Sequence, residues 1–199
     1  MQFFSDFFTV WVKFFFILTP FFVMSLFLVM TKDMGPVAKR NLALRVTGAV
    51  ILACLVIYFF GNFIFSVFGI TIDAFRVGAG AILFLSAVDL VRGSEEGKMK
   101  DDNGDIAVVP LAIPVTVGPG TTGVLLVMGA ETTDIHTRLI GYGALLTAIF
   151  CVMVLLLLAT PIERLIGQRG ISILSKLTGL VLSAIAAQMV FTGIKNFLS

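Results

Sequence analysis

The sequence predicts an all-α membrane protein with six transmembrane helices. Of its 199 residues, 58% are hydrophobic and only 13% are charged, whereas a soluble domain usually has about 25% charged residues. The charged residues are also spaced so that long apolar runs remain between them, and about 20 mostly apolar residues suffice for one helical crossing. These runs show no two-residue alternation, which is the pattern of membrane barrel strands. The chain therefore has too few charges to cover a water-facing surface.

The six predicted crossings are the uncharged intervals, taken in chain order. They cover residues 14–31, 46–72, 77–88, 106–130, 139–162 and 177–194. The third interval is short, and we expect Arg76 and Asp89 at its ends to reach the interface and lengthen the helix. The first interval has no basic start and no small-residue cleavage site, so we interpret it as a crossing and not as a signal peptide.

Basic residues alternate in number along the connections between crossings. The three connections after the first, third and fifth crossings carry nine Lys and Arg residues, and the other side carries Lys13, Arg138 and Lys195. The positive-inside rule therefore predicts a multi-pass protein of the inner (plasma) membrane with both termini outside the cytoplasm. The charged segment 93–105 is expected to be a cytoplasmic linker between a first three-helix unit, 1–92, and a second, 106–199.

The two units resemble each other weakly at an offset of about 98 to 100 residues. Leu28-Val29-Met30 recurs at 126–128, and Gly69 aligns with Gly167. Each unit has three crossings, an odd number, so repeated units would have opposite orientations in the membrane. Inverted repeats of this kind are typical of secondary transporters.

Two of the crossings contain residues that interrupt helices. Residues 109–124 read VPLAIPVTVGPGTTGV; each proline lacks an N–H, and each glycine costs about 1 kcal/mol inside a helix. We therefore expect the fourth crossing to break near the midplane at Gly118-Pro119-Gly120, and the first to break at Thr19-Pro20. The N–H groups of a half-helix attract a carboxylate, and unwound carbonyls accept from an ammonium. The alternative is that these residues only kink helices or allow close packing.

The two breaks together predict a central site for a small zwitterion. Gln188 is the strongly polar residue in the core of the last crossing, and would contact the ligand or a neighbouring helix. Asp89 is the candidate proton-coupling carboxylate, or else pairs with Arg92 at the interface. Asp73 and Arg76 are expected to pair at the outer interface. The candidate substrate-binding residues are Thr19, Pro20, Pro114, Gly118, Pro119, Gly120, Thr121, Thr122 and Gln188.

Other function classes are not indicated. One His and two Cys argue against a metal or haem site, and no cofactor is expected. The chain has no phosphate-binding glycine loop and no nucleophile with its base, so we do not expect an enzyme. Basic and acidic residues nearly cancel, 14 against 12, so nothing in the charge balance suggests an electrostatic nucleic-acid binder, and none is expected. The sequence neither indicates nor excludes a homo-oligomer.

Two motifs resemble the MarC family of six-helix inner-membrane proteins, which includes archaeal and bacterial transporters of small neutral amino acids. They are PLAIPVTVGPG at 110–120 and FRVGAGAILFLSAVDLVRG at 75–93, and the resemblance covers essentially the whole chain. It implies an inverted pair of three-helix units with interrupted first and fourth helices. Many members read roughly Asn-Pro-Ile-Gly at the first break, where this chain reads Thr-Pro-Phe-Phe at 19–22, so its first break is expected to be shallower and its pocket bulkier.

The sequence thus predicts a secondary transporter of small neutral amino acids such as glycine, alanine or serine. Transport would be coupled to protons and would proceed by alternating access around a midplane site. The alternative is a non-transporting membrane scaffold or partner protein that retains the transporter fold. An intramembrane enzyme is disfavoured because no paired acids or nucleophile lie near the breaks.

Overall fold

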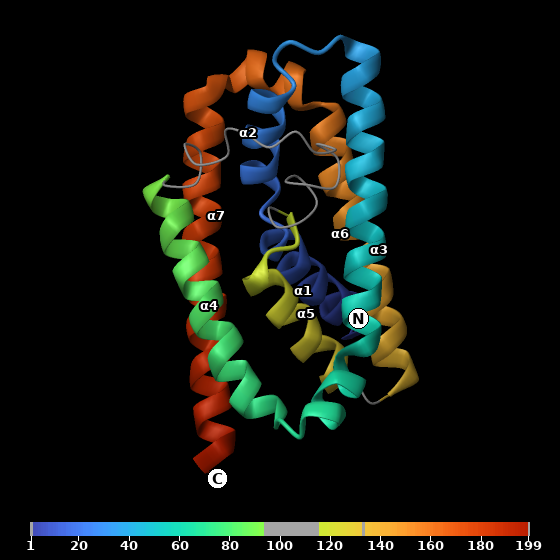
Figure 1. The fold of residues 1–199 in the computed structure, drawn as a ribbon, viewed down its shortest axis with the longest axis vertical. Helices are drawn as coiled ribbons and strands as arrows, with labels where there is room; N and C mark the ends of the chain where they lie inside the picture. The colour runs from blue at the N-terminus through green and yellow to red at the C-terminus, as the bar shows by residue number, and fades with distance from the viewer. Residues whose placement is uncertain (1, 94–115, 133, 199) are drawn as a thin grey trace.

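The structure is a computed structural model, and it describes residues 2–93, 116–132 and 134–198. Every regular element in those ranges is an α-helix (Figure 1). Five stretches are long and apolar enough to cross a membrane, which confirms the prediction of an all-α membrane protein. The helices are α1 (Gln2–Ile17), α2 (Pro20–Met30), α3 (Pro36–Phe68), α4 (Ile72–Arg92), α5 (Pro119–Glu131), α6 (Ile135–Leu157) and α7 (Ala159–Leu198).

The five spanning stretches agree with five of the six predicted crossings, with different bounds. Helices α1 and α2 together make the first, and α4 extends the short third interval to 21 residues that include Arg76 and Asp89. Helix α3 begins at Pro36, ten positions before the predicted interval, because Lys39, Arg40 and Arg45 are part of the helix. The linker 93–105, apart from Gly93, and the first part of the predicted crossing 106–130, residues 106–115, lie outside the described residues. Helix α5 is the described helix of that crossing.

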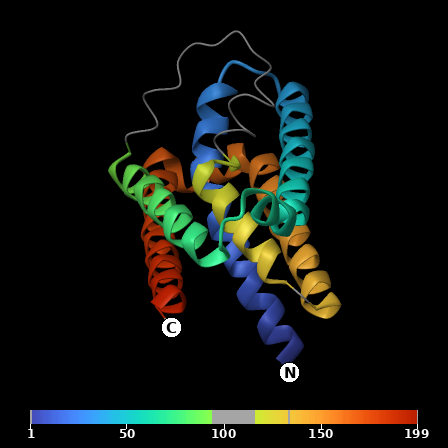
Figure 2. The same ribbon diagram turned by 60° about the horizontal axis from the view of Figure 1, so that its bottom comes forward.

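Both chain ends lie at one end of the molecule, which we call the termini end (Figures 1 and 2). The turn between α3 and α4 is also at this end. The connection from α2 to α3 and the junction of α6 with α7 lie at the opposite end, which we call the loop end. The described connections thus alternate between the ends in the order that the predicted topology requires.

Local signals explain where most helices begin and end. Pro36 is the first residue of α3, and Gly69, with φ +63°, ends it in the left-handed conformation that glycine adopts without strain. The Thr71 hydroxyl oxygen accepts the N–H of Ala74 at 3.2 Å and so caps α4. The Asp134 carboxylate caps α6 by accepting the N–H of Thr137 at 3.1 Å.

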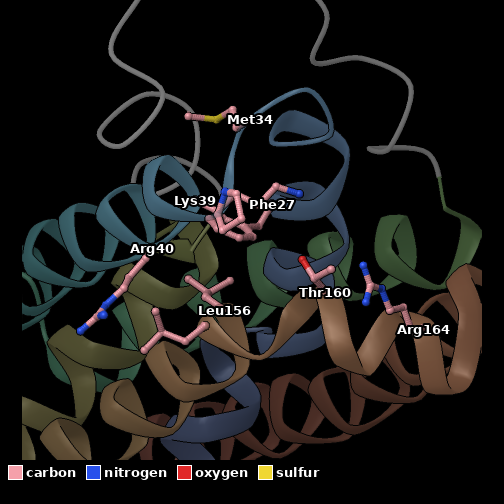
Figure 3. A pocket seen from close by; sticks show the side chains of 9 residues that line it. Phe27, Met34, Lys39, Arg40, Leu156, Thr160 and Arg164 are labelled. Atoms are coloured by element: carbon pink, nitrogen blue, oxygen red, sulfur yellow. The ribbon is translucent and has the colours of Figure 1, made fainter.

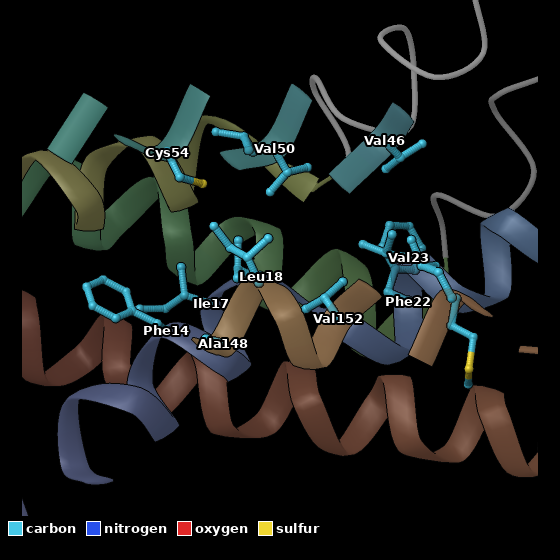
Figure 4. Packing of buried hydrophobic residues seen from close by; sticks show 14 of the residues in the cluster. Phe14, Ile17, Leu18, Phe22, Val23, Val46, Val50, Cys54, Ala148 and Val152 are labelled. Atoms are coloured by element: carbon cyan, nitrogen blue, oxygen red, sulfur yellow. The ribbon is translucent and has the colours of Figure 1, made fainter. Parts of the chain in front are cut away.

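The core lies where α1 packs against α6 and α2 packs against α7 and α6, and side chains of α3 join the same buried cluster. Figure 4 shows Phe14, Ile17 and Leu18 in one packed cluster with Val50, Cys54 and Val152. Phe14 and Cys54 have no exposed surface, and Ile17 and Leu18 each expose 1%. This packing fixes the segment around the end of α1, and therefore the position of the first predicted break.

Helices α4 and α7 pack closely through Gly80, Gly179 and Gly193, which we call the glycine seam. A Cβ on Gly193 would lie 2.7 Å from the Asp73 carbonyl oxygen, and one on Gly179 would lie 2.9 Å from that of Ala87. At Gly80 it would lie 3.0 Å from the Ala186 carbonyl oxygen. Only residues without a side chain allow two backbones to approach in this way.

Helix α7 is interrupted near its start. Gly167 has φ +69° and ψ 168°, so it divides the element into a short segment that follows α6 and a long segment that packs on α4. The predicted crossing 177–194 lies within the long segment.

The single tryptophan lies on α1 between the termini end and the first break. Trp11 stacks on Phe8 and Phe15, with ring centroids 6.0 and 5.3 Å apart.

Candidate functional site

The first predicted break is present between α1 and α2. Helix α1 ends at Ile17 and α2 begins at Pro20, and Thr19 between them has φ +46° and ψ +54°. It is the one non-glycine residue with positive φ among those described. A proline disfavours the helical conformation in the residue before it and has no N–H to continue the helix. Since a left-handed L-residue costs on the order of 1–2 kcal/mol, Thr19 marks a real break and not a bend.

The second predicted break coincides with the start of α5. Gly118 is extended, with φ −79° and ψ 177°, and its carbonyl oxygen accepts the N–H of Thr122 at 2.8 Å. Pro119 is the first residue of α5, where its missing N–H has no cost. Residues 106–115, upstream of this break, lie outside the described residues.

The two breaks touch at the centre of the molecule. The Thr121 hydroxyl donates a buried hydrogen bond of 3.1 Å to the carbonyl oxygen of Ile17, the last residue of α1. From this point α2 runs toward the loop end and α5 toward the termini end (Figure 1). Each helix therefore begins here, and the partial positive charges of two helix N-termini meet at one place.

A small cavity of about 80 Å³ lies at this meeting point, and we call it the central cavity. Five of the predicted substrate-binding residues line it: Thr19, Gly118, Pro119, Gly120 and Thr121. The other lining residues come from α1, α2, α4 and α7: Ile17, Phe22, Leu83, Ser86, Leu90 and Leu182.

The polar groups around the central cavity are hydroxyls and backbone groups. No described lining residue is charged. The Thr19 hydroxyl oxygen is buried and has no hydrogen-bond partner, which costs about 1–3 kcal/mol when nothing satisfies it. Ser86 is already bonded, donating to the Ile82 carbonyl oxygen at 3.1 Å. The site is therefore arranged to hydrogen-bond a small ligand without supplying an ionised side chain.

Comparison with known proteins identifies the family. Residues 4–198 match the MarC family of integral membrane proteins. The chain belongs to the MarC family. A UPF0056 membrane protein of Methanocaldococcus jannaschii is 35% identical over 190 residues, which cover 92% of each chain. One from Aquifex aeolicus is 33% identical over 83% of this chain and 82% of that one, and YhcE of Escherichia coli is 28% identical over 95% and 94%. No solved structure matches the chain.

In this MarC protein, three of the other predicted substrate-binding residues do not line the central cavity. Pro20 is buried as the first residue of α2 and does not line the cavity. Thr122 lines a different cavity, of about 620 Å³, between α4 and α5. Gln188 is exposed and lines a third, of about 200 Å³. Pro114 lies outside the described residues.

The predicted proton-coupling residue lies close to the central cavity but does not line it. Asp89 is half-buried on α4, one helical turn beyond Ser86. The alternative interpretation was an ion pair with Arg92, and the described part of the chain contains no such pair. Within residues 2–93, 116–132 and 134–198, no cluster of His, Cys, Asp and Glu could hold a metal ion.

The third cavity, which we call the charged vestibule, adjoins the central cavity on its termini side. Ile17 lines both. The vestibule is also lined by Lys13, Arg76, Glu131 and Gln188, so it has charged side chains, whereas the described lining of the central cavity has none.

An ion-pair network crosses the vestibule of this MarC protein. Arg76 forms the predicted pair with Asp73, at 2.5 Å, and a second pair with Glu131 that joins α4 to α5. Asn196 of α7 donates to Asp73 at 3.2 Å. Sequence reasoning missed Glu131, although both it and Arg76 belong to the outer ends of predicted crossings and so to the same side of the membrane.

Proposed function

We propose that this MarC protein is a secondary transporter of a small neutral amino acid of the size of glycine, alanine or serine. The observation that carries the proposal is the central cavity, which lies where α2 and α5 begin and α1 ends. Membership of the MarC family supports an integral membrane protein, but it does not identify a substrate.

A zwitterion suits the polarity of the central cavity. The first N–H groups of a helix have no partner within it, so the starts of α2 and α5 can donate to a carboxylate, together with the unpartnered Thr19 hydroxyl. Backbone carbonyls at the end of α1, next to Ile17, can accept from the ammonium. Because none of the described residues that line the cavity is ionised, they would leave a ligand with net charge uncompensated, at a cost of several kcal/mol.

The size of the cavity favours the smallest amino acids. At roughly 10–15 Å³ for one water, about 80 Å³ accommodates a ligand of about five to eight water-sized groups. Leu83, Leu90 and Leu182 limit the space for the ligand's side chain.

We further propose an inverted repeat and alternating access around this site. The two X-Pro breaks, at Pro20 and Pro119, are 99 positions apart. Gly69 and Gly167 are 98 positions apart, and both have left-handed φ values, +63° and +69°. These correspondences support equivalent units, and the charged vestibule supplies an access path from the termini end. Asp89, one turn from the lining residue Ser86, is the proposed site of proton coupling.

Uptake into proteoliposomes tests the proposal. Wild-type protein is expected to accumulate labelled glycine, alanine or serine, and to do so faster with a pH gradient. Thr19→Val removes the unpartnered hydroxyl at nearly constant volume and is expected to reduce uptake at least about tenfold, the loss of a hydrogen bond to a charged group. The matched control is Thr9→Val on the preceding helix α1, where the exposed hydroxyl donates to the Ser5 carbonyl oxygen.

Two results would contradict the proposal. One is wild-type protein that moves none of the three amino acids, with or without the gradient. The other is equal uptake by wild type and Thr19→Val, which would remove the central cavity as the binding site.

A further inference from the structure

A large cavity at the loop end is separate from the central cavity and carries a different chemistry. Its volume is about 570 Å³, and it lies between the start of α3, the end of α2 and the junction of α6 with α7 (Figure 3). We call it the basic pocket. It is lined by Phe27, Met34, Pro36, Lys39, Arg40, Leu156, Leu157, Thr160 and Arg164.

Three cations surround the basic pocket. Lys39 and Arg40 come from the first turns of α3, and Arg164 from the start of α7, where Thr160 adds a hydroxyl. In Figure 3 Thr160 and Arg164 lie on one side of Lys39, and Arg40 lies on the other. None of the described lining residues is acidic, and the ion pairs found in the described ranges involve none of these cations. The positive charge here is therefore not neutralised within the described protein.

The N-terminus of α3 adds to the positive electrostatic potential of the basic pocket. Pro36 at the first helical position lines the pocket, no side chain caps the helix, and its first turn has no acidic residue. A helix N-terminus attracts anions through its partial positive charge and its free N–H groups. Together with the three side chains, it makes the basic pocket a site for a phosphate group.

The floor of the pocket is apolar. Phe27 and Leu156 are buried beneath it, and Leu157 is 39% exposed at its edge, followed by the exposed Leu158. A free phosphate ion would use the cations and leave this apolar surface in water, whereas a phospholipid covers both with one molecule. The pocket is also at the end of a spanning bundle, where a bilayer has its headgroups.

We propose that the basic pocket binds an anionic phospholipid, with the phosphate held by Lys39, Arg40 and Arg164 and an acyl chain on the apolar surface beside Leu157. Basic pockets between helices are a known means of holding lipid headgroups. The site is independent of the central cavity, because the two share no lining residue.

The test measures lipid retention by native mass spectrometry of the full chain in a neutral detergent. Phosphatidylglycerol and phosphatidylcholine are added separately, and wild type is expected to bind phosphatidylglycerol at least about tenfold more tightly. Lys39→Gln/Arg40→Gln/Arg164→Gln is expected to lose this preference, since each cation near a headgroup contributes measurably. Arg40→Lys/Arg164→Lys keeps the charge and is expected to retain it, which separates the loss of charge from a failure to fold.

A matched control removes three other exposed basic residues of the same end. Lys32→Gln/Arg92→Gln/Arg169→Gln has the same net charge as the pocket variant, and none of the three lines the pocket. It is expected to keep the preference for phosphatidylglycerol. An equal loss in this control would overturn the proposal, because the effect would then be general surface charge.

Competition with soluble anions distinguishes a lipid site from a site for a free anion. Glycerol phosphate and inorganic phosphate, at the same concentration as the lipid, are expected to displace little phosphatidylglycerol. If either displaced it fully, the pocket would be an anion site and not a lipid site.

Discussion

At the scale of single residues, Thr19 carries the most information. Its left-handed backbone is unfavourable for a β-branched residue, yet the buried packing of Ile17 and Leu18 before it and Pro20 after it leave the chain no helical alternative. The same conformation leaves its hydroxyl buried without a partner beside the central cavity. Strain and an unsatisfied donor at one residue are typical of a ligand site.

Thr19→Asn should relieve that strain. Asparagine is enriched in the left-handed region, so we expect the free energy of unfolding to rise by up to about 1 kcal/mol. The amide also donates, so uptake should be retained, in contrast to Thr19→Val. Thermal unfolding in detergent measures the first effect, and a lower melting temperature than wild type would show that the left-handed backbone is not strained.

Asp134 gives a pH dependence outside the spanning segments. The backbone N–H of Thr137 holds the pKa of its carboxyl below the ordinary value of 3.8. A folded-state pKa below the unfolded one adds stability above the unfolded value, and this stability is lost as the pH falls through the folded value.

Asp134→Asn keeps a capping oxygen but does not titrate. We therefore expect wild type to be the more stable of the two near neutral pH, and the difference to disappear in acid below about pH 3.8. Melting temperatures of both proteins over a pH series measure this, with Asp6→Asn, also exposed, as the charge control. A difference that stayed constant down to the acid end would refute the assignment.

At the scale of elements, the sequence predicted the breaks but not the faces of the helices around them. Proline and glycine act on their own backbone, so Thr19-Pro20 and Gly118-Pro119 could be identified locally. The rotation of α5 about its own axis, which decides which face meets which neighbouring helix, depends on residues far away in the sequence. Thr121 faces α1, and Thr122, about 100° further round the helix, faces the cavity beside α4.

The same limit explains Gln188 and Glu131. Gln188 was placed in the core because its neighbours in sequence are apolar, but its side of α7 faces the charged vestibule. The pair of Glu131 with Arg76 joins residues 55 positions apart, a separation at which no helical spacing rule applies. The sequence predicts where a residue lies along its helix, but not the direction in which its side chain points.

The glycines of α5 show a related ambiguity. A Cβ on Gly120 would lie 2.9 Å from the Leu83 side chain and 3.0 Å from its Cα. Gly120 therefore serves the packing of α5 on α4 as well as lining the cavity, and a bulky residue there would alter both.

A Gly→Ala substitution in the glycine seam and one outside it, at Gly78, are expected to have opposite effects on stability. Gly179→Ala places a Cβ 2.9 Å from the Ala87 carbonyl oxygen, so we expect a loss of about 1–3 kcal/mol in the free energy of unfolding. Gly78→Ala on α4 meets nothing within 4 Å and should gain about 0.5–1 kcal/mol from helix propensity. Denaturant or thermal unfolding in detergent compares them, and equal changes of the same sign would show that close approach does not govern the seam.

At the scale of the whole molecule, the two ends differ in charge. The connections described at the loop end are among the three predicted connections that carry nine Lys and Arg residues. Both termini lie at the other end. From the positive-inside rule we therefore expect the basic pocket to face the cytoplasm and the charged vestibule to face outward.

Thiol labelling in intact cells checks this orientation. In a background with Cys54 and Cys151 replaced, Ser5→Cys at the termini end should react with a membrane-impermeant reagent, and Lys32→Cys at the loop end should react only after the cells are opened. Both positions are exposed in the structure, so a difference in labelling between them reports the side of the membrane on which each lies. The reverse labelling pattern would invert the topology.

The fluorescence of Trp11 can report on the first helix, α1. It is the only indole in the chain, and it stacks between Phe8 and Phe15 on the helix whose last carbonyl oxygen accepts from Thr121. Intrinsic fluorescence excited at the red edge of protein absorption therefore comes from α1 alone. A titration with unlabelled amino acid, read as a change in emission wavelength or quenching, follows this helix during binding without any added dye.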